Sequence, residues 1–393
     1  MDRDAREVLE KRIASGYSLP TLSPVAVKLV EIASEDTCSL VDLISLIEKD
    51  PSLAVSLLKM ANSAFFMAGQ PVATLRAAIM RIGFQQVRVM GLSLSLRNTF
   101  PMGKVGSLDY ENFWRISLYR GLIGKSLAQH LRACNPEEAF VAGLILEIGF
   151  LIFYDLYLKH KPDVIIPDLD GLEELLRWEE EQCGINHRTV GEFALAYWKF
   201  PEQIVACQKY YGDEIADNNV APLARVSELA RVFSHAMFHK QTDFHALFLA
   251  VRNSLGLPDE TINDIILAAF EQVEDIAESL KLELNKERDL LELMEKANRS
   301  LGRLSEKITR YRDEMSKSGL PAFDTLERKE HQPSVEYTLQ AVAHEIRNPL
   351  VTVAGFARRL SKALDPASES ARYAAIILEE AKRLETILSD MDR

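Results

Sequence analysis

Cysteine is scarce in this chain, with four residues in 393, at positions 38, 134, 183 and 207. The four are scattered without paired spacing, so the sequence offers neither a zinc site nor a disulfide framework, and it suits a reducing cytoplasm. A basic excess is missing as well. The formal net charge of −12 argues against nucleic acid as the main partner.

The sequence also contains no segment typical of a membrane span and no motif typical of a nucleotide-binding loop. The charged N-terminus predicts that no signal peptide is present. The longest apolar run, about residues 139–158, is interrupted by Glu147 and Asp155, so we predict a buried helix and not a membrane span. No Gly-x-x-x-x-Gly-Lys phosphate loop occurs, so we expect no ATP site in this chain. Together these features predict a cytoplasmic protein without membrane contact.

Strand alternation is not convincing anywhere, whereas helical apolar periods run through almost all of residues 1–270. After two early helices, Pro51 is expected to begin a third. Later helices are predicted at about 74–98, 109–133, 136–158, 170–182, 187–198, 201–211, 221–238 and 242–254. The sequence therefore predicts a large all-α domain over residues 1–257.

Seven stretches of this region form a pattern that none of them forms alone. They are LPTLSPVA at 19–26, DPSLA at 50–54, LLKMANSAF at 57–65, AAIMRIG at 77–83, Phe113-Trp114, PEEAFVAGL at 136–144 and WKFP at 198–201. As a set they resemble the HDOD domain, a relative of the HD phosphohydrolases. The resemblance covers nearly all of residues 15–250 and implies a sensory domain.

The sequence departs from the HD enzymes at their metal site. The family's Gly-Leu-x-His-Asp-Ile-Gly segment here has Leu146 in place of the histidine and Glu147 in place of the aspartate. Ile116 stands where related sequences often carry another histidine. A two-metal hydrolase needs several converging ligands, so we expect no metal and regard HD-type hydrolysis as the weakest hypothesis. We interpret Glu147 as a surface or buried ion-pair residue and His187 as structural.

Three further histidines lie close together in the sequence. His235 and His239 are one helical turn apart, which is compatible with metal binding, and His245 follows. No third ligand is evident beside the first two, so we interpret all three as surface residues.

Residues 258–316 are predicted to be a separate element, in which a heptad pattern from about Glu271 to Met315 indicates a parallel dimeric coiled coil. Eleven of thirteen a and d positions are apolar, and the flanks are rich in charge, which predicts a coiled-coil signalling helix. The two exceptions, Glu283 and Glu287, lie together and are expected to mark a region that can switch its packing; a plain spacer helix is the alternative. A linker with Gly319, Pro321 and Pro333 follows at 317–333.

Residues 334–393 carry two narrow apolar seams. The first comprises Leu339, Ala343, Ile346, Leu350, Val353, Ala357, Leu360 and Leu364, and the second comprises Ile377, Ala381, Leu384, Leu388 and Met391. Asp365-Pro366-Ala367-Ser368 supplies a helix breaker and a cap between them. Because neither narrow seam can be buried by its own helix, an antiparallel hairpin that pairs with a second copy is predicted. The result is a homodimeric four-helix bundle.

The run His-Glu-Ile-Arg-Asn-Pro-Leu at 344–350 is the most informative motif. His344 lies one step off the seam, Glu345 follows it, and Asn348 is one turn further on the same face. A neutral imidazole is a good nucleophile near pH 7, and an adjacent carboxylate can orient the ring and stabilise its developing charge. Pro349 removes an amide, which predicts a local bend.

This run resembles the phosphoacceptor helix of sensor histidine kinases. The resemblance implies that His344 is the phosphoacceptor, that Glu345 is its acid–base partner, and that Asn348 positions water for a phosphatase reaction. It also implies a response-regulator receiver domain as partner. ATP and Mg²⁺ are expected only with an ATP-binding kinase domain, either downstream or in trans.

Two interpretations of the whole chain remain open. The sequence stops at Arg393, about where the second seam helix should end, which favours a portion of a longer kinase. In that case the HDOD domain controls phosphorylation of His344. The alternative is a non-catalytic HDOD scaffold that is dimerised by its C-terminal helices, in which His344 has no role.

Overall fold

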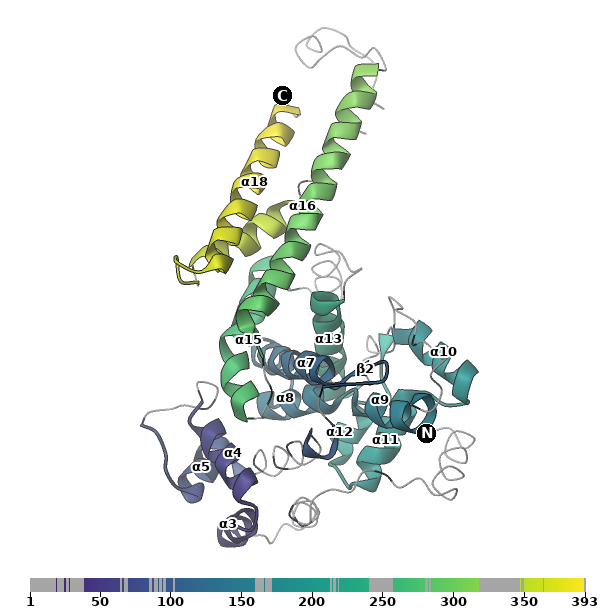
Figure 1. The fold of residues 1–393 in the computed structure, drawn as a ribbon, viewed down its shortest axis with the longest axis vertical. Coiled ribbons are helices and arrows are strands. Elements are labelled where there is room, and N and C mark those ends of the chain that lie inside the picture. Colours follow the sequence, from purple (N-terminus) through teal and green to yellow (C-terminus); the bar gives the residue numbers. More distant parts are fainter. Residues whose placement is uncertain are drawn as a thin grey trace. The chain divides into compact units, whose positions relative to one another are not determined.

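A computed structural model of the chain describes residues 39–63, 70–84, 97–159 apart from 102, 172–212, 219–239, 257–279, 284–317, 350–362 and 364–391, with isolated positions between these ranges. The described residues are almost entirely helical, which confirms the predicted all-α class (Figure 1). The chain divides into two compact units. Unit 1 comprises residues 1–235 and 268–285, and unit 2 comprises 236–267 and 286–393.

Three short helices form the first part of unit 1, and side chains cap each of them. They are α3 (Leu40–Ile47), α4 (Pro51–Ala61) and α5 (Leu75–Ile82). The Asp50 carboxylate accepts a hydrogen bond from the Leu53 amide at 3.0 Å, and Pro51 opens α4 as predicted. The helix expected at 74–98 differs, because Gly83 with φ 97° ends α5 after eight residues.

Two long segments form the centre of unit 1. Helix α7 (Tyr110–Leu131) follows a two-residue hairpin of β1 (Lys104–Val105) and β2 (Leu108–Asp109), and α8 (Pro136–Ile145) packs along it (Figure 1). The two helices approach closely at glycines. A Cβ on Gly143 would lie 2.9 Å from the carbonyl oxygen of Arg120, so only glycine fits there.

The apolar run after Pro136 is buried but is not one helix. Turn residues Leu146 and Glu147 separate α8 from α9 (Ile148–Phe153), which continues into the π-helix η1 (Tyr154–Leu158). Residues 136–158 are long and apolar enough to cross a membrane by composition, but 78% of the most apolar window is buried inside the protein. This agrees with the predicted core segment, and the unexpected turn places Glu147 at a helix end.

The remaining helices of unit 1 enclose that turn. They are α10 (Leu172–Cys183), α11 (His187–Tyr197), α12 (Glu202–Ala206), most of α13 (Pro222–Phe238) and the second part of α15 (Asp259–Ser279). Tyr119 of α7 packs on Phe270 of α15 with ring centroids 5.0 Å apart. The helix predicted at 242–254 lies outside the described residues.

The segment predicted as one coiled coil consists of two helices. Helix α15 ends at Ser279 and α16 (Lys286–Lys317) begins after Leu284 and Asn285, which are not helical. The break between Ser279 and Lys286 spans the position of one polar heptad residue, Glu283, and the other, Glu287, belongs to the first turn of α16. An acidic side chain in a seam disfavours continuous apolar pairing, so the interruption lies where the pattern is weakest.

Unit 2 contains the predicted antiparallel hairpin. Its first helix is described over residues 350–362, here called the first hairpin helix, and its second is α18 (Glu369–Met391). The Ser368 hydroxyl accepts a hydrogen bond from the Ala371 amide at 3.1 Å, which confirms the predicted cap. Helix α16 lies alongside α18 (Figure 1).

Candidate functional site

The predicted phosphoacceptor residues His344, Glu345 and Asn348 lie outside the described residues, as does Pro349. Their roles therefore stay predictions. The structure does describe the seam that follows them. Four predicted seam residues of the first hairpin helix, Leu350, Val353, Ala357 and Leu360, are at most 2% exposed.

The second seam is buried in the same way. Ile377, Ala381 and Leu384 of α18 are each 1% exposed. Phe356, which the pattern did not single out, is also fully buried and widens the apolar face of the first hairpin helix. All of this burial occurs within one chain, so the hairpin is established and the dimeric bundle stays a prediction.

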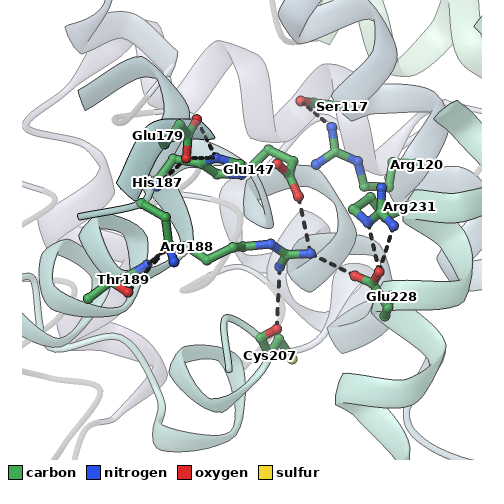
Figure 2. A network of polar contacts seen from close by, with 11 residues as sticks. Ser117, Arg120, Glu147, Glu179, His187, Arg188, Thr189, Cys207, Glu228 and Arg231 are labelled. Carbon is green, nitrogen blue, oxygen red and sulfur yellow. Dashed lines mark hydrogen bonds and ion pairs between the residues drawn. The ribbon is translucent and has the colours of Figure 1, made fainter. Parts of the chain in front are cut away.

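A second candidate site lies in unit 1, where the HD enzymes would hold metal. Leu146 is fully buried and Ile116 is partly buried, and neither side chain can ligate a metal. Glu147 projects from the turn between α8 and α9 into a buried cluster of charges (Figure 2). Its carboxylate lies 2.7 Å from His187 Nε2 and 3.2 Å from Arg188 Nη2. Glu147 is thus an ion-pair residue, as one of the two interpretations predicted.

His187 is held from both sides of its ring. The Asn186 side chain caps α11 and directs the first residue of that helix inward, where His187 is fully buried. Its Nδ1 lies 2.8 Å from Glu179, and its backbone amide also donates to Glu179 at 2.8 Å. Burial opposes charge on the ring, but the carboxylates of Glu179 and Glu147 outweigh it and raise the pKa of His187 to about 9.

An imidazolium that donates from both nitrogens has no lone pair left for a metal. Metal binding requires the neutral ring with one free nitrogen. In the described part of the chain, no group of three or more histidine, cysteine or acidic side chains is placed to hold a metal ion. The structural interpretation of His187 therefore rests on positive contacts that occupy the whole ring.

Guanidinium groups fill the rest of the cluster. Glu228 is fully buried and accepts from Arg188 Nη2 at 2.6 Å, and from Arg231 Nε at 2.8 Å. Arg120 of α7 donates to Ser117 at 3.2 Å, while its Nε and Nη1 atoms have no hydrogen-bond partner among the described residues. Burial lowers the pKa of Arg120 to about 10, which still leaves it charged at neutral pH.

The cluster, here called the charge network, has one more cation than anions. Its cations are Arg120, His187, Arg188 and Arg231, and its carboxylates are Glu147, Glu179 and Glu228 (Figure 2). Burial would raise the pKa of Glu147, but Arg188, His187 and Arg120 hold it well below its ordinary value. The positive side chains thus surround Glu147 and hold its carboxylate in the ionised form.

Sequence analysis found two members of this network and missed the others. Glu147 and His187 were visible because they fall at family positions. Glu179, Arg188 and Glu228 were not singled out, although a glutamate within the apolar pattern of α13 is a usable signal for a buried ion pair. Arg188 pairs with Glu228, 40 positions further on, so no local spacing reveals that contact.

The structure describes two of the three histidines that lie close together in the sequence, His235 and His239. His235 and His239 are partly buried, so the prediction of surface residues holds only in part. The His239 carbonyl oxygen accepts a hydrogen bond from Lys296 Nζ of α16 at 2.5 Å, which ties α16 to the end of α13 within unit 2. His245 lies outside the described residues.

Comparison with known families assigns two parts of the chain. Residues 19–213 match the model of the HDOD domain, and residues 335–393 match that of the His Kinase A (phospho-acceptor) domain, HisKA. The chain is therefore a histidine kinase-like signalling protein. It belongs to the proteins that join an HDOD domain to a HisKA domain, as its motifs predict.

Two relatives are similar to parts of the chain. The sensor histidine kinase ZraS of Salmonella typhimurium is 33% identical over 69 residues, which are 18% of this chain and 15% of ZraS. YuxH, an uncharacterized protein of Bacillus subtilis, is 25% identical over 147 residues, which are 37% of this chain and 35% of YuxH. The chain thus matches about a third or less of the length of these relatives.

Solved structures show the same helical fold. An HDOD domain protein of unknown function from Geobacter sulfurreducens has a TM-score of 0.51 at 21% identity, covering 72% of this chain and 99% of that chain. A Shewanella amazonensis SB2B protein classed as a metal-dependent phosphohydrolase has a TM-score of 0.52 at 21% identity, covering 70% and 97%. At this identity the likeness establishes the fold alone.

Proposed function

We propose that this chain is the sensory and phosphoacceptor portion of a cytoplasmic sensor histidine kinase. In this proposal the HDOD domain controls phosphorylation of His344 and transfer of the phosphoryl group to an aspartate of a response-regulator receiver domain. The observation that carries the proposal is the HisKA match over residues 335–393, which contains the His-Glu-Ile-Arg-Asn-Pro-Leu run and is followed by a hairpin with buried seams.

The proposed chemistry assigns one task to each motif residue. The neutral ring of His344 attacks the γ-phosphorus of ATP, forming an N–P bond as the bond from phosphorus to ADP breaks. Glu345 keeps the other ring nitrogen protonated and stabilises the positive charge that develops on the ring. In the separate phosphatase reaction, Asn348 positions a water molecule that attacks the phosphorus of the partner's phospho-aspartate, breaking the acyl phosphate bond and releasing inorganic phosphate and the aspartate carboxylate.

ATP and Mg²⁺ would reach the site through a separate ATP-binding kinase domain. That domain is either downstream in a longer protein or supplied in trans. The proposed working form is a homodimer, since a four-helix bundle is the usual assembly of two such hairpins. Signals would pass from the HDOD domain through α15 and α16, whose interruption near Glu283 and Glu287 is a natural point for a packing change.

The test is phosphorylation of the chain by a histidine-kinase ATP-binding domain with γ-labelled ATP. The expected result is label that is stable in base, labile in acid, and absent from the His344→Ala variant. The matched control is His130→Ala, because His130 is an exposed histidine on α7 far from the motif in sequence. Equal labelling of His344→Ala and the unchanged chain would refute the acceptor role.

The alternative function is a non-catalytic scaffold, and the charge network is the observation that supports this alternative. In this alternative the HDOD domain acts by binding, and its support is that both ring nitrogens of His187 are engaged by Glu147 and Glu179. Under the scaffold hypothesis, a polar substitution at fully buried Leu360 abolishes function while His344→Ala leaves it intact. Under the kinase hypothesis both variants lose phosphotransfer.

A further inference from the structure

The apolar seam of the hairpin is already occupied within a single chain. Besides the hairpin itself, two other segments of unit 2 bury apolar side chains. Ile262, Ile265 and Ile266 of the first part of α15 are fully buried, and so are Leu290, Leu293, Met294, Ala297 and Leu301 of α16, at no more than 2% exposure. With α16 packed along α18, these segments take the place that a second hairpin would take in a dimeric bundle.

Ion pairs attach the first hairpin helix to α15. Arg359 contacts the carboxylate of Asp264 through Nη1, and its Nη2 lies 3.8 Å from Glu260. Here these contacts are called the Arg359 latch. All three side chains are partly or well exposed, so the latch is open to salt and contributes modestly, as surface pairs do.

The packing behind the latch is incomplete. A cleft of about 640 Å³ lies between α15 and the first hairpin helix, lined by Leu267, Leu350 and Ala354 among others. Asn263, also at this cleft, is 2% exposed, and its Oδ1 atom has no hydrogen-bond partner among the described residues. An unpaired buried amide oxygen and an unfilled cleft both weaken this arrangement relative to a fully packed one.

We propose that this packing is a closed, autoinhibited form in which the chain's own α15 and α16 occupy the hairpin seam. Opening it breaks the Arg359 latch and exchanges those helices for the hairpin of a second copy. This proposal rests on the proposed function, because it concerns how the dimeric bundle that carries His344 becomes available. The two packings compete for one seam, so stabilising either one removes the other.

The experiment measures the dimer association constant of the full chain by sedimentation equilibrium at low salt. Arg359→Glu places like charges together and is expected to raise the constant at least about fivefold, a typical coupling between two states. Adding Asp264→Arg to that variant restores an opposite-charge pair and is expected to return the constant to within about twofold of the original. The increase should disappear in about 1 M salt, where the screening length is only about 3 Å.

A matched control and an independent variant complete the design. Arg383→Glu removes an exposed guanidinium of the same hairpin, whose partner Glu380 lies on its own helix α18, and should leave the constant unchanged. Asn263→Leu removes the unpaired buried amide and so should stabilise the closed form. The dimer association constant should therefore fall. If circular dichroism shows that Arg359→Glu fails to fold, the dimer association constant of Asn263→Leu provides the test of the proposal instead.

Three outcomes would overturn the inference. One is an original chain that is dimeric at the lowest measurable concentration, and another is an equal response to Arg359→Glu and Arg383→Glu. The third is dimerisation that does not respond to Asn263→Leu. None of these measurements involves phosphate, so failure here is distinct from a failure of His344 to accept a label.

Discussion

The charge network predicts that the stability of unit 1 depends on pH through one buried histidine. The folded state raises the pKa of His187 to about 9, against about 6.5 for an unfolded histidine. Because the folded pKa is the higher one, this stabilisation is complete below pH 6.5 and is lost as pH rises through 9. A shift of this size corresponds to about 3 kcal/mol, of which about 2 kcal/mol disappears between pH 6.5 and 8.5.

The assay is urea unfolding of the full chain, followed by tryptophan fluorescence at several pH values. All three tryptophans, Trp114, Trp178 and Trp198, belong to unit 1, so the signal reports that unit. The series ends at pH 8.5 because burial raises the pKa of Cys207 to about 12. In the unfolded chain this thiol ionises near its ordinary pKa of about 8.5. At higher pH that ionisation favours the unfolded chain and adds a second loss of stability.

His187→Gln is the perturbation, with His130→Gln as the control on exposed α7 surface. The expected result is a pH slope that vanishes in the first variant and persists in the second. Wild-type stability that is flat from pH 6.5 to 8.5, or a slope that survives in His187→Gln, would refute the assignment of a buried imidazolium.

Three further predictions test the packing of both units. Glu228→Gln removes the carboxylate that Arg188 and Arg231 share, leaving Arg188 only its 3.2 Å contact with Glu147, and should lower the unfolding free energy by about 3–5 kcal/mol in the same assay. Glu192→Gln at a more exposed pair should cost under about 1 kcal/mol. Gly143→Ala forces a methyl group against the Arg120 carbonyl oxygen 2.9 Å away and should cost about 1–3 kcal/mol. Lys296→Met leaves carbonyl oxygens at the end of α13 unpaired and should cost about 1–3 kcal/mol, measured by thermal unfolding followed by circular dichroism.

Much of the fold could be predicted because the sequence signals of a helix lie within the helix and its immediate flanks. A proline at the first position, a polar cap and an apolar stripe lie within a few residues of one another, and they correctly placed α4 at Pro51 and the hairpin turn before Ser368. The burial of Val353 and Ile377 likewise follows from period alone. These features need no knowledge of what the helix packs against.

The errors arose where the chain is shaped by distant partners. Residues 136–158 were predicted as one helix, but a turn at Glu147 lets that carboxylate reach His187, 40 positions further on. Similarly, Gly83 was one residue of a family motif in the sequence, and its positive φ ends a helix that periodicity alone would continue. Periodicity reports which face of a segment is apolar, and it does not report where tertiary contacts break the segment.

The charge network places four cationic side chains among three carboxylates in the interior of unit 1. A metal-dependent hydrolase needs positive charge together with an open coordination position for water. Here the positive charge belongs to the side chains of Arg188 and His187. The His187 ring contacts Glu147 and Glu179, and the Arg188 guanidinium contacts Glu228. Direct ion pairs thereby join the turn before α9 to α10, α11 and α13. Because two of these pairs need the positive charge of His187, the contacts between these helices are expected to weaken when its imidazolium loses a proton.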